Sequence, residues 1–88
     1  MKIVIVGAGK VGYSLAQRLI QDDHDVYVID RSPERIHNLE NTLDVSLVLG
    51  NGSDVQLLNE IDMSDVGMFI AVTDSDEVNM LSLSLIHI

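Results

Sequence analysis

The stretch KIVIVGAGKVG, residues Lys2–Gly12, decides the fold class of this chain. Its first part, Lys2–Val6, is a run rich in β-branched residues, which is typical of a strand buried on both faces of a parallel sheet. The second part, Gly7–Gly12, has the pattern G-x-G-x-x-G and opens a segment, Gly9 to about Gln21, with apolar residues at helical spacing. A strand, a glycine turn and a helix in this order begin a βαβ unit.

The rest of the chain continues this alternation of strand and helix. Three further runs have the pattern of buried strands: Val26–Ile29, Val45–Leu49 and Gly67–Val72. Helices are predicted between the strands, and a final helix is predicted after the fourth strand because Asp74 and Glu77 have capping-box spacing. Strands that alternate with helices predict parallel pairing through right-handed crossovers, and therefore a single α/β unit.

Composition narrows the range of functions. The chain has 88 residues, a formal net charge of −9 and no cysteine. The acidic balance argues against a nucleic-acid partner or an anionic membrane surface, and the lack of cysteine excludes a disulfide scaffold and a thiol nucleophile. The apolar run Ile3–Ala8 is far shorter than the roughly 20 residues of a membrane-spanning helix. We therefore expect a cytoplasmic domain that does not insert into the membrane.

The glycine motif has a physical rationale as a phosphate site. Gly7 permits a tight turn, Gly9 has no Cβ to keep a pyrophosphate away from backbone N–H groups, and Gly12 lets the helix pack close to the strand. The helix N-terminus adds unpaired N–H donors and a partial positive charge. The alternative interpretation is a tight strand-to-helix turn without a ligand.

Asp30 is the candidate for ribose recognition. It ends the second strand, 18 residues beyond Gly12, which is about the spacing at which an acid reaches the ribose hydroxyls of a dinucleotide. A carboxylate there favours NAD(H) over NADP(H), because it repels a 2′-phosphate. Arg31 weakens this argument, since a neighbouring arginine can accommodate such a phosphate. The alternative role of Asp30 is that of a turn residue.

Small and polar residues follow the third and fourth strands. Gly50, Asn51, Gly52 and Ser53 lie where an adenine base would slide against the backbone, although Ser53 could equally cap the next helix. Thr73 could contact ribose or pyrophosphate, or simply end its strand.

Two charged features remain open in function. Lys10 lies inside the glycine motif and is either a phosphate contact or a solvated lysine. Asp74, Asp76 and Glu77 could gather a divalent cation, or could be the acidic first turn that a helix dipole favours.

Residues for a chemical step are not evident. No serine or lysine nucleophile has a neighbouring base in the sequence, and no histidine pair has metal-ligand spacing. The pattern Tyr27-x-x-x-Arg31 lies on the wrong strand for a short-chain dehydrogenase and ends in arginine. The sequence therefore predicts a nucleotide cradle and not an enzyme.

Four motifs together resemble the TrkA N-terminal domain, of the KTN or RCK family of regulators attached to potassium channels and transporters. They are GAGKVG from Gly7, VID ending at Asp30, GNGS from Gly50 and AVTDSDEVNM from Ala71. The likeness runs from Met1 to about Leu81, and its last motif is not shared by dehydrogenases generally.

The resemblance implies a cytoplasmic peripheral subunit that binds NAD(H), or in relatives ATP or ADP, and controls a membrane potassium-uptake pore. Such domains dimerise and assemble into rings. By position, the resemblance places Gly7, Ala8, Gly9, Lys10 and Val11 at the phosphates, Asp30 at the ribose, Gly50 to Ser53 at the adenine, and Thr73 with Asp74 near the fourth strand.

It also implies a Rossmann-like parallel sheet of strand order 3-2-1-4, truncated after the fourth strand and its helix. We expect residues 1–81 to form an incomplete nucleotide-binding domain, and residues 82–88, which depart from the family pattern, to be a non-native tail. The fourth strand would then be an uncovered edge, which favours self-association or instability. The alternatives are the cofactor half of a truncated NAD-dependent dehydrogenase, and a fragment that binds nothing.

Overall fold

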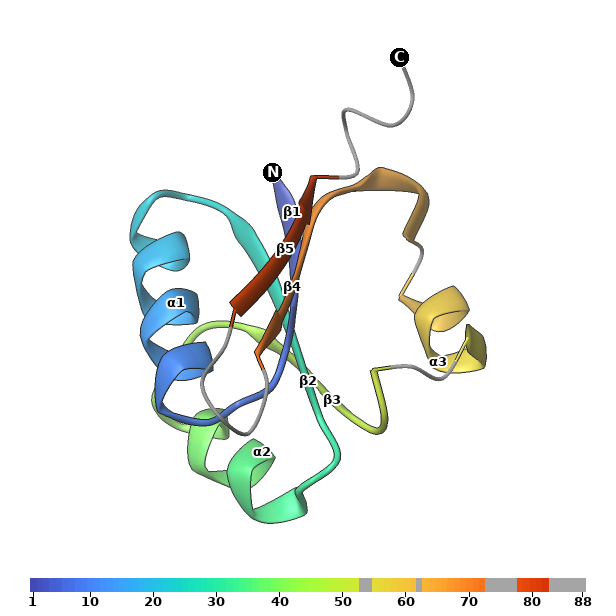
Figure 1. The fold of residues 1–88 in the computed structure, drawn as a ribbon. Helices are drawn as coiled ribbons and strands as arrows, with labels where there is room; N and C mark the ends of the chain where they lie inside the picture. Colours follow the sequence, from blue (N-terminus) through green and yellow to red (C-terminus); the bar gives the residue numbers. More distant parts are fainter. Residues whose placement is uncertain (53–54, 62, 73–77, 83–88) are drawn as a thin grey trace.

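The computed structural model describes residues 1–52, 55–61, 63–72 and 78–82 of the chain. Figure 1 shows a central sheet with helices α1 and α2 on one face and α3 on the other. The elements, in chain order, are β1 (Lys2–Val6), α1 (Lys10–Gln21), β2 (Asp25–Asp30), α2 (Pro33–Glu40), β3 (Ser46–Leu49), α3 (Val55–Glu60), the 3-10 turn η1 (Met63–Asp65), β4 (Val66–Val72) and β5 (Val78–Ser82).

The sheet has the strand order β3-β2-β1-β4-β5. Strands β1 to β4 are mutually parallel, with Val4 of β1 opposite Tyr27 of β2 and Phe69 of β4. Consecutive parallel strands are connected through a helical crossover, as the alternating sequence pattern requires. The predicted order 3-2-1-4 and the predicted Rossmann-like class are therefore confirmed.

The helix predicted after the fourth strand is wrong for the part of it that the structure describes. Val78–Ser82 forms β5, which pairs antiparallel with β4 so that Ala71 lies opposite Asn79. The physical reason is pairing with β4, because a strand at this edge completes backbone hydrogen bonds that β4 would otherwise leave unpaired. The proposed helix start, from Asp74 to Glu77, lies outside the described residues. The expectation that β4 is an uncovered edge is wrong for the same reason.

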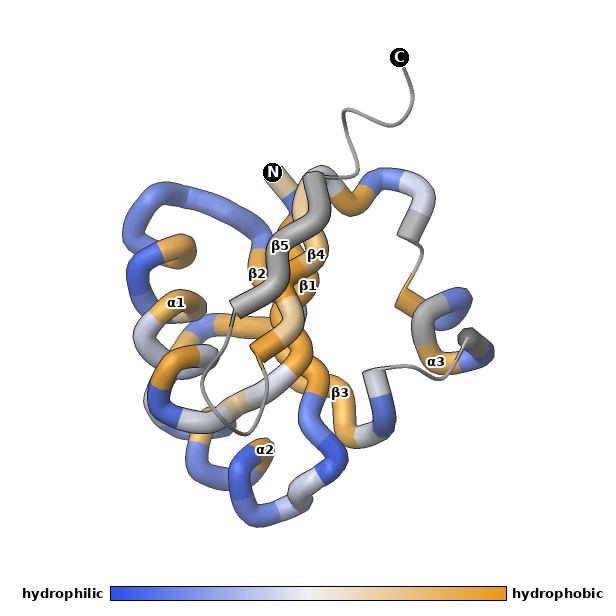
Figure 2. Tube along the Cα trace, in the orientation of Figure 1, coloured by the Kyte–Doolittle hydropathy of each residue, from blue (hydrophilic) through white to orange (hydrophobic). Residues whose placement is uncertain are grey.

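The core has two layers, one on each face of the sheet. Alternate side chains of β1 divide between them, since Ile3 and Ile5 pack toward α1 and α2, whereas Val4 packs toward α3. All three are at most 1% exposed. Figure 2 shows apolar strands at the centre of the molecule and hydrophilic turns on α1 and α2. This burial on both faces fixes the register of β1, and with it the position of the glycine loop that follows.

None of the helices in the described part of the chain is both long and apolar enough to cross a membrane.

Candidate functional site

The glycine loop joins β1 to α1 in a tight turn. Gly7 has a φ of +114°, which L side chains rarely adopt, and its N–H donates to the carbonyl oxygen of Ile29 at 2.8 Å. Gly12 packs against the turn so closely that a Cβ there would overlap the carbonyl oxygen of Gly7. The tight turn predicted at Gly7 and the close packing predicted at Gly12 are therefore confirmed.

Helix α1 begins with donors that its N-cap leaves free. The N-cap residue is Gly9, which has no side chain to accept a hydrogen bond from the first turn, and its carbonyl oxygen accepts from Tyr13 N–H at 2.8 Å. Among the described residues, a Cβ built on Gly9 finds only the Arg35 Nη1 atom within 4 Å. As far as the described residues go, the space above the first turn is wide enough for an anion to approach the backbone amides.

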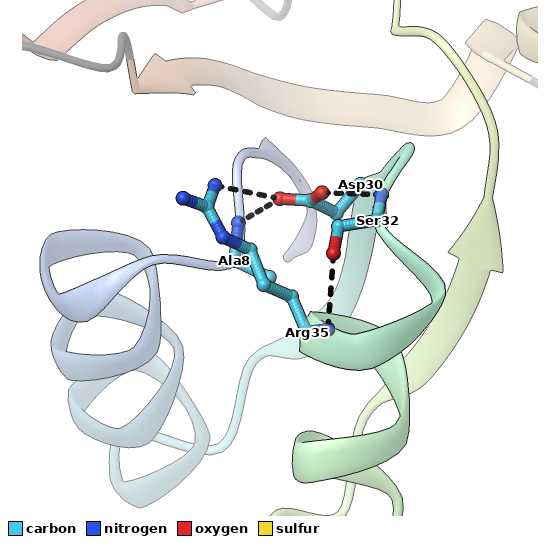
Figure 3. Close-up of polar contacts among 4 residues, drawn as sticks. All are labelled: Ala8, Asp30, Ser32 and Arg35. Carbon is cyan, nitrogen blue, oxygen red and sulfur yellow. Dashed lines mark hydrogen bonds and ion pairs between the residues drawn. The ribbon is translucent and has the colours of Figure 1, made fainter.

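Asp30 ties the glycine loop to the end of β2. Asp30 is 7% exposed, and its carboxylate accepts hydrogen bonds from Ala8 N–H at 2.7 Å and from Ser32 N–H at 2.8 Å. Figure 3 shows these contacts at the meeting point of three chain segments. Each carboxylate oxygen has a second lone pair, so the group can accept further hydrogen bonds from a ligand. Asp30 is thus an acceptor already fixed in place.

Arg35 completes this arrangement, and sequence reasoning missed it. Its Nη1 atom lies 3.5 Å from Asp30 Oδ2, and its side chain is 50% exposed. Helix α2 positions it, because the N-cap Ser32 accepts from Arg35 N–H through its hydroxyl oxygen at 3.3 Å. One signal in the sequence could have indicated it. A basic residue in the first turn of α2 is unfavourable next to the positive end of the helix dipole, which suggests that Arg35 has a role outside the helix.

Two cavities flank Arg35. The first, the strand-end cavity, has a volume of about 320 Å³ and lies at the carboxyl ends of the strands. It is lined by Val6, Gly7, Ile29, Asp30, Arg31, Arg35, Gly50, Asn51, Gly52 and Val72. The second, the α1–α2 cavity, has a volume of about 410 Å³. It is lined by Ala8, Gly9, Lys10, Tyr13, Ser14, Arg35, Asn38 and Leu39.

The cavities bring together most of the residues expected at a nucleotide site. Six of them line the strand-end cavity: Gly7, Asp30, Arg31, Gly50, Asn51 and Gly52. Three line the α1–α2 cavity: Ala8, Gly9 and Lys10. Val11 and Gly12 lie in the first turn of α1 and line neither cavity. Ser53, Thr73 and Asp74 lie outside the described residues.

Positive charge concentrates at this end of the molecule. The chain has only five basic residues, and three of them, Lys10, Arg31 and Arg35, line the two cavities. The other two are paired with acids elsewhere, Lys2 with Asp65 at 3.0 Å and Arg18 with Asp22 at 3.4 Å. In a chain of net charge −9, this distribution favours an anionic ligand at the glycine loop.

The described residues hold no group of three or more His, Asp or Glu side chains arranged to bind a metal ion. The acidic segment considered for a cation, Asp74 to Glu77, lies outside them. What the site offers chemically is a set of hydrogen-bond donors and cations for phosphate, with a buried carboxylate for hydroxyl groups.

A parallel sheet of order 3-2-1-4, with a glycine turn after β1 and an acid at the end of β2, defines a Rossmann-like α/β domain. The chain belongs to the TrkA-N domain family, whose model matches residues 3–88. The resemblance seen in the sequence is confirmed.

Several curated relatives are named as TrkA proteins or TrkA homologs. The chain is 41% identical over 87 residues to the Trk system potassium uptake protein TrkA of Halomonas elongata, and 44% identical over 87 residues to that of Azorhizobium caulinodans. Each alignment covers 99% of this chain and 19% of the relative. The TrkA homolog of Methanothermobacter thermautotrophicus is 41% identical, with 40% of its length covered. The chain therefore spans about a fifth of the first two relatives and two fifths of the third.

Proposed function

We propose that this chain is a nucleotide-binding regulatory module of a potassium uptake system, with NAD(H) as its ligand and ATP or ADP as further ligands. The observation that carries the proposal is the Asp30 carboxylate, buried at the end of β2 and held by Ala8 N–H of the glycine loop. An acid fixed at this position is what recognition of a free adenosine ribose requires. Membership of the TrkA-N family supports the link to potassium uptake.

In this proposal each part of the ligand has its own surroundings. The ribose hydroxyls would donate to Asp30, and the adenine would lie in the strand-end cavity beside Gly50 and Gly52. The phosphates would accept from the first-turn amides of α1, with Lys10 close by. The donor set fits a nucleotide, because it offers amides and cations to phosphate and an acceptor to hydroxyls.

The ligand would act as a signal and not as a reactant. A nucleotide shifts an equilibrium between two states of an assembly only by its difference in affinity for them. Moving such an equilibrium from 1:99 to 99:1 takes about 5.5 kcal/mol in total. Shared over the subunits of a ring, this amounts to a small contribution from each site. We propose a homo-oligomer on the cytoplasmic side of a membrane potassium transporter as that assembly.

Calorimetric titration with NADH, NADPH, ADP and ATP tests the ligand class. We expect NADH to bind more tightly than NADPH, because the Asp30 carboxylate accepts a ribose hydroxyl but repels a 2′-phosphate. Tighter binding of NADPH would contradict the role given to Asp30. A chain that binds none of the four would contradict the proposed function as a whole.

A further inference from the structure

Arg35 lies between the strand-end cavity and the α1–α2 cavity. Among the described residues, it is the one that lines both. Its Nη1 atom lies 3.5 Å from Asp30 Oδ2, and the same atom is 4.0 Å from where a Cβ of Gly9 would be. Figure 3 shows the guanidinium reaching from α2 toward the glycine loop beside Asp30. The group is therefore within reach of both the ribose position and the phosphate position of the proposed nucleotide.

The ion pair with Asp30 has the properties of a contact that can be exchanged. Charge-assisted N–H···O bonds are about 2.7–2.9 Å long, so the 3.5 Å separation is long for one. Half of the arginine side chain is exposed, which screens the attraction. Asp30 does not depend on Arg35 for its position, since Ala8 N–H and Ser32 N–H already hold its two oxygens.

We propose that Arg35 is a specificity-determining residue that rests on Asp30 in the empty site and binds a phosphate when the nucleotide enters. The α1–α2 cavity, with Arg35 and Lys10 on its wall, would receive the phosphoryl group. The move would leave Asp30 Oδ2 with a lone pair for a ribose hydroxyl, so ribose and phosphate recognition are linked through one side chain. Arginine suits this role because its planar fork matches phosphate in two-point contacts. The inference rests on the proposed nucleotide function.

The test compares ADP with adenosine, which share the ribose and base but not the phosphates. In the full chain, Arg35→Ala should weaken ADP binding by about tenfold or more, the loss expected for a charge-assisted hydrogen bond, and leave adenosine binding within about threefold. Arg35→Lys should keep part of the ADP affinity. The matched control is Arg18→Ala, which removes a cation on α1 that lines neither cavity and should leave both ligands unaffected.

Salt dependence gives a second readout that a purely structural role would not change. The logarithm of the ADP affinity should fall less steeply with the logarithm of salt concentration in Arg35→Ala, because one phosphate contact is lost. An unchanged slope, unchanged ADP affinity, or an equal loss for ADP and adenosine would overturn the inference. A wild-type chain that binds neither ADP nor NADH would instead refute the proposed function itself.

Discussion

Asp30 combines a structural and a binding role in one carboxylate. Two backbone N–H groups donate to it, and Asp30→Ala would leave them without their acceptor near the buried end of β2. We expect a loss of about 1–3 kcal/mol in NADH binding and a measurable loss of stability in urea unfolding. Asp22→Ala, which removes an exposed acid at the far end of α1, is the control and should change neither. Unchanged NADH affinity in Asp30→Ala would remove this residue from the site.

Gly9 and Gly12 form a second test at the residue scale, because the same substitution has opposite structural effects at the two positions. A Cβ on Gly12 would overlap the Gly7 carbonyl oxygen, so Gly12→Ala should unfold or strongly destabilise the chain. Within the part of the chain that the structure describes, a Cβ on Gly9 meets only the flexible Arg35 Nη1 atom, at 4.0 Å, and the φ of −73° is acceptable to alanine. Gly9→Ala should therefore remain folded yet bind NADH at least about tenfold more weakly, because the Cβ occupies the phosphate approach. Full NADH affinity in Gly9→Ala would contradict the proposed phosphate position.

The predictable residues of the site are those whose roles are local in the chain. Gly7 and Gly12 follow from the turn itself, and Asp30 follows from its place at the end of a strand. Arg35 could not be found in this way, because its contact with Asp30 depends on how α2 docks beside the glycine loop. Arg35 is five residues after Asp30 in the chain. This spacing does not predict a contact, because a strand ends and a helix begins between the two residues.

Among the elements, α2 is the one whose start controls the site. The hydroxyl of Ser32 caps the helix by accepting from Arg35 N–H, and the backbone N–H of Ser32 donates to Asp30. Ser32→Ala should lower the free energy of unfolding by about 1 kcal/mol, as for other lost N-caps. Ser14→Ala, on the exposed surface within α1, is the matched control and should be neutral or slightly stabilising. Equal unfolding midpoints in urea for the two variants would show that the cap contributes nothing.

The sequence pattern predicted strands β1 to β4 correctly but not the strand β5 that follows them. Strands β1 to β4 were predictable because their apolar runs, glycines and spacing all agree with one topology. The segment after β4 was not, because the caps suggested by Asp74 and Glu77 favoured a helix, whereas the strand Val78–Ser82 depends on a partner that local spacing does not reveal. Pairing with β4 decides the outcome, since a strand placed against an open edge completes its backbone hydrogen bonds.

For the molecule as a whole, β5 covers the edge of β4, and β3 and β5 are the two outermost strands of the described sheet. Strand β3 is only Ser46–Leu49, and Leu49 is 54% exposed at its end. Exposed strand edges favour pairing with a second copy, so we still expect self-association, with the reason moved from β4 to the outermost strands β3 and β5. Light scattering at micromolar concentration should give a dimer or larger species. A stable, monodisperse monomer would contradict this expectation.

The central claim, a nucleotide held at the glycine loop, is tested most directly by titrating NADH into the ¹⁵N-labelled chain and following amide shifts residue by residue. We predict saturable changes at Gly7–Val11, Asp30–Ser32 and Gly50–Gly52, around the two cavities that Arg35 joins. A separate cavity at the opposite end of the sheet, beside His24 and Asp44, serves as the internal control and should show none. No saturable change at the glycine loop, or changes confined to the control cavity, would contradict the account.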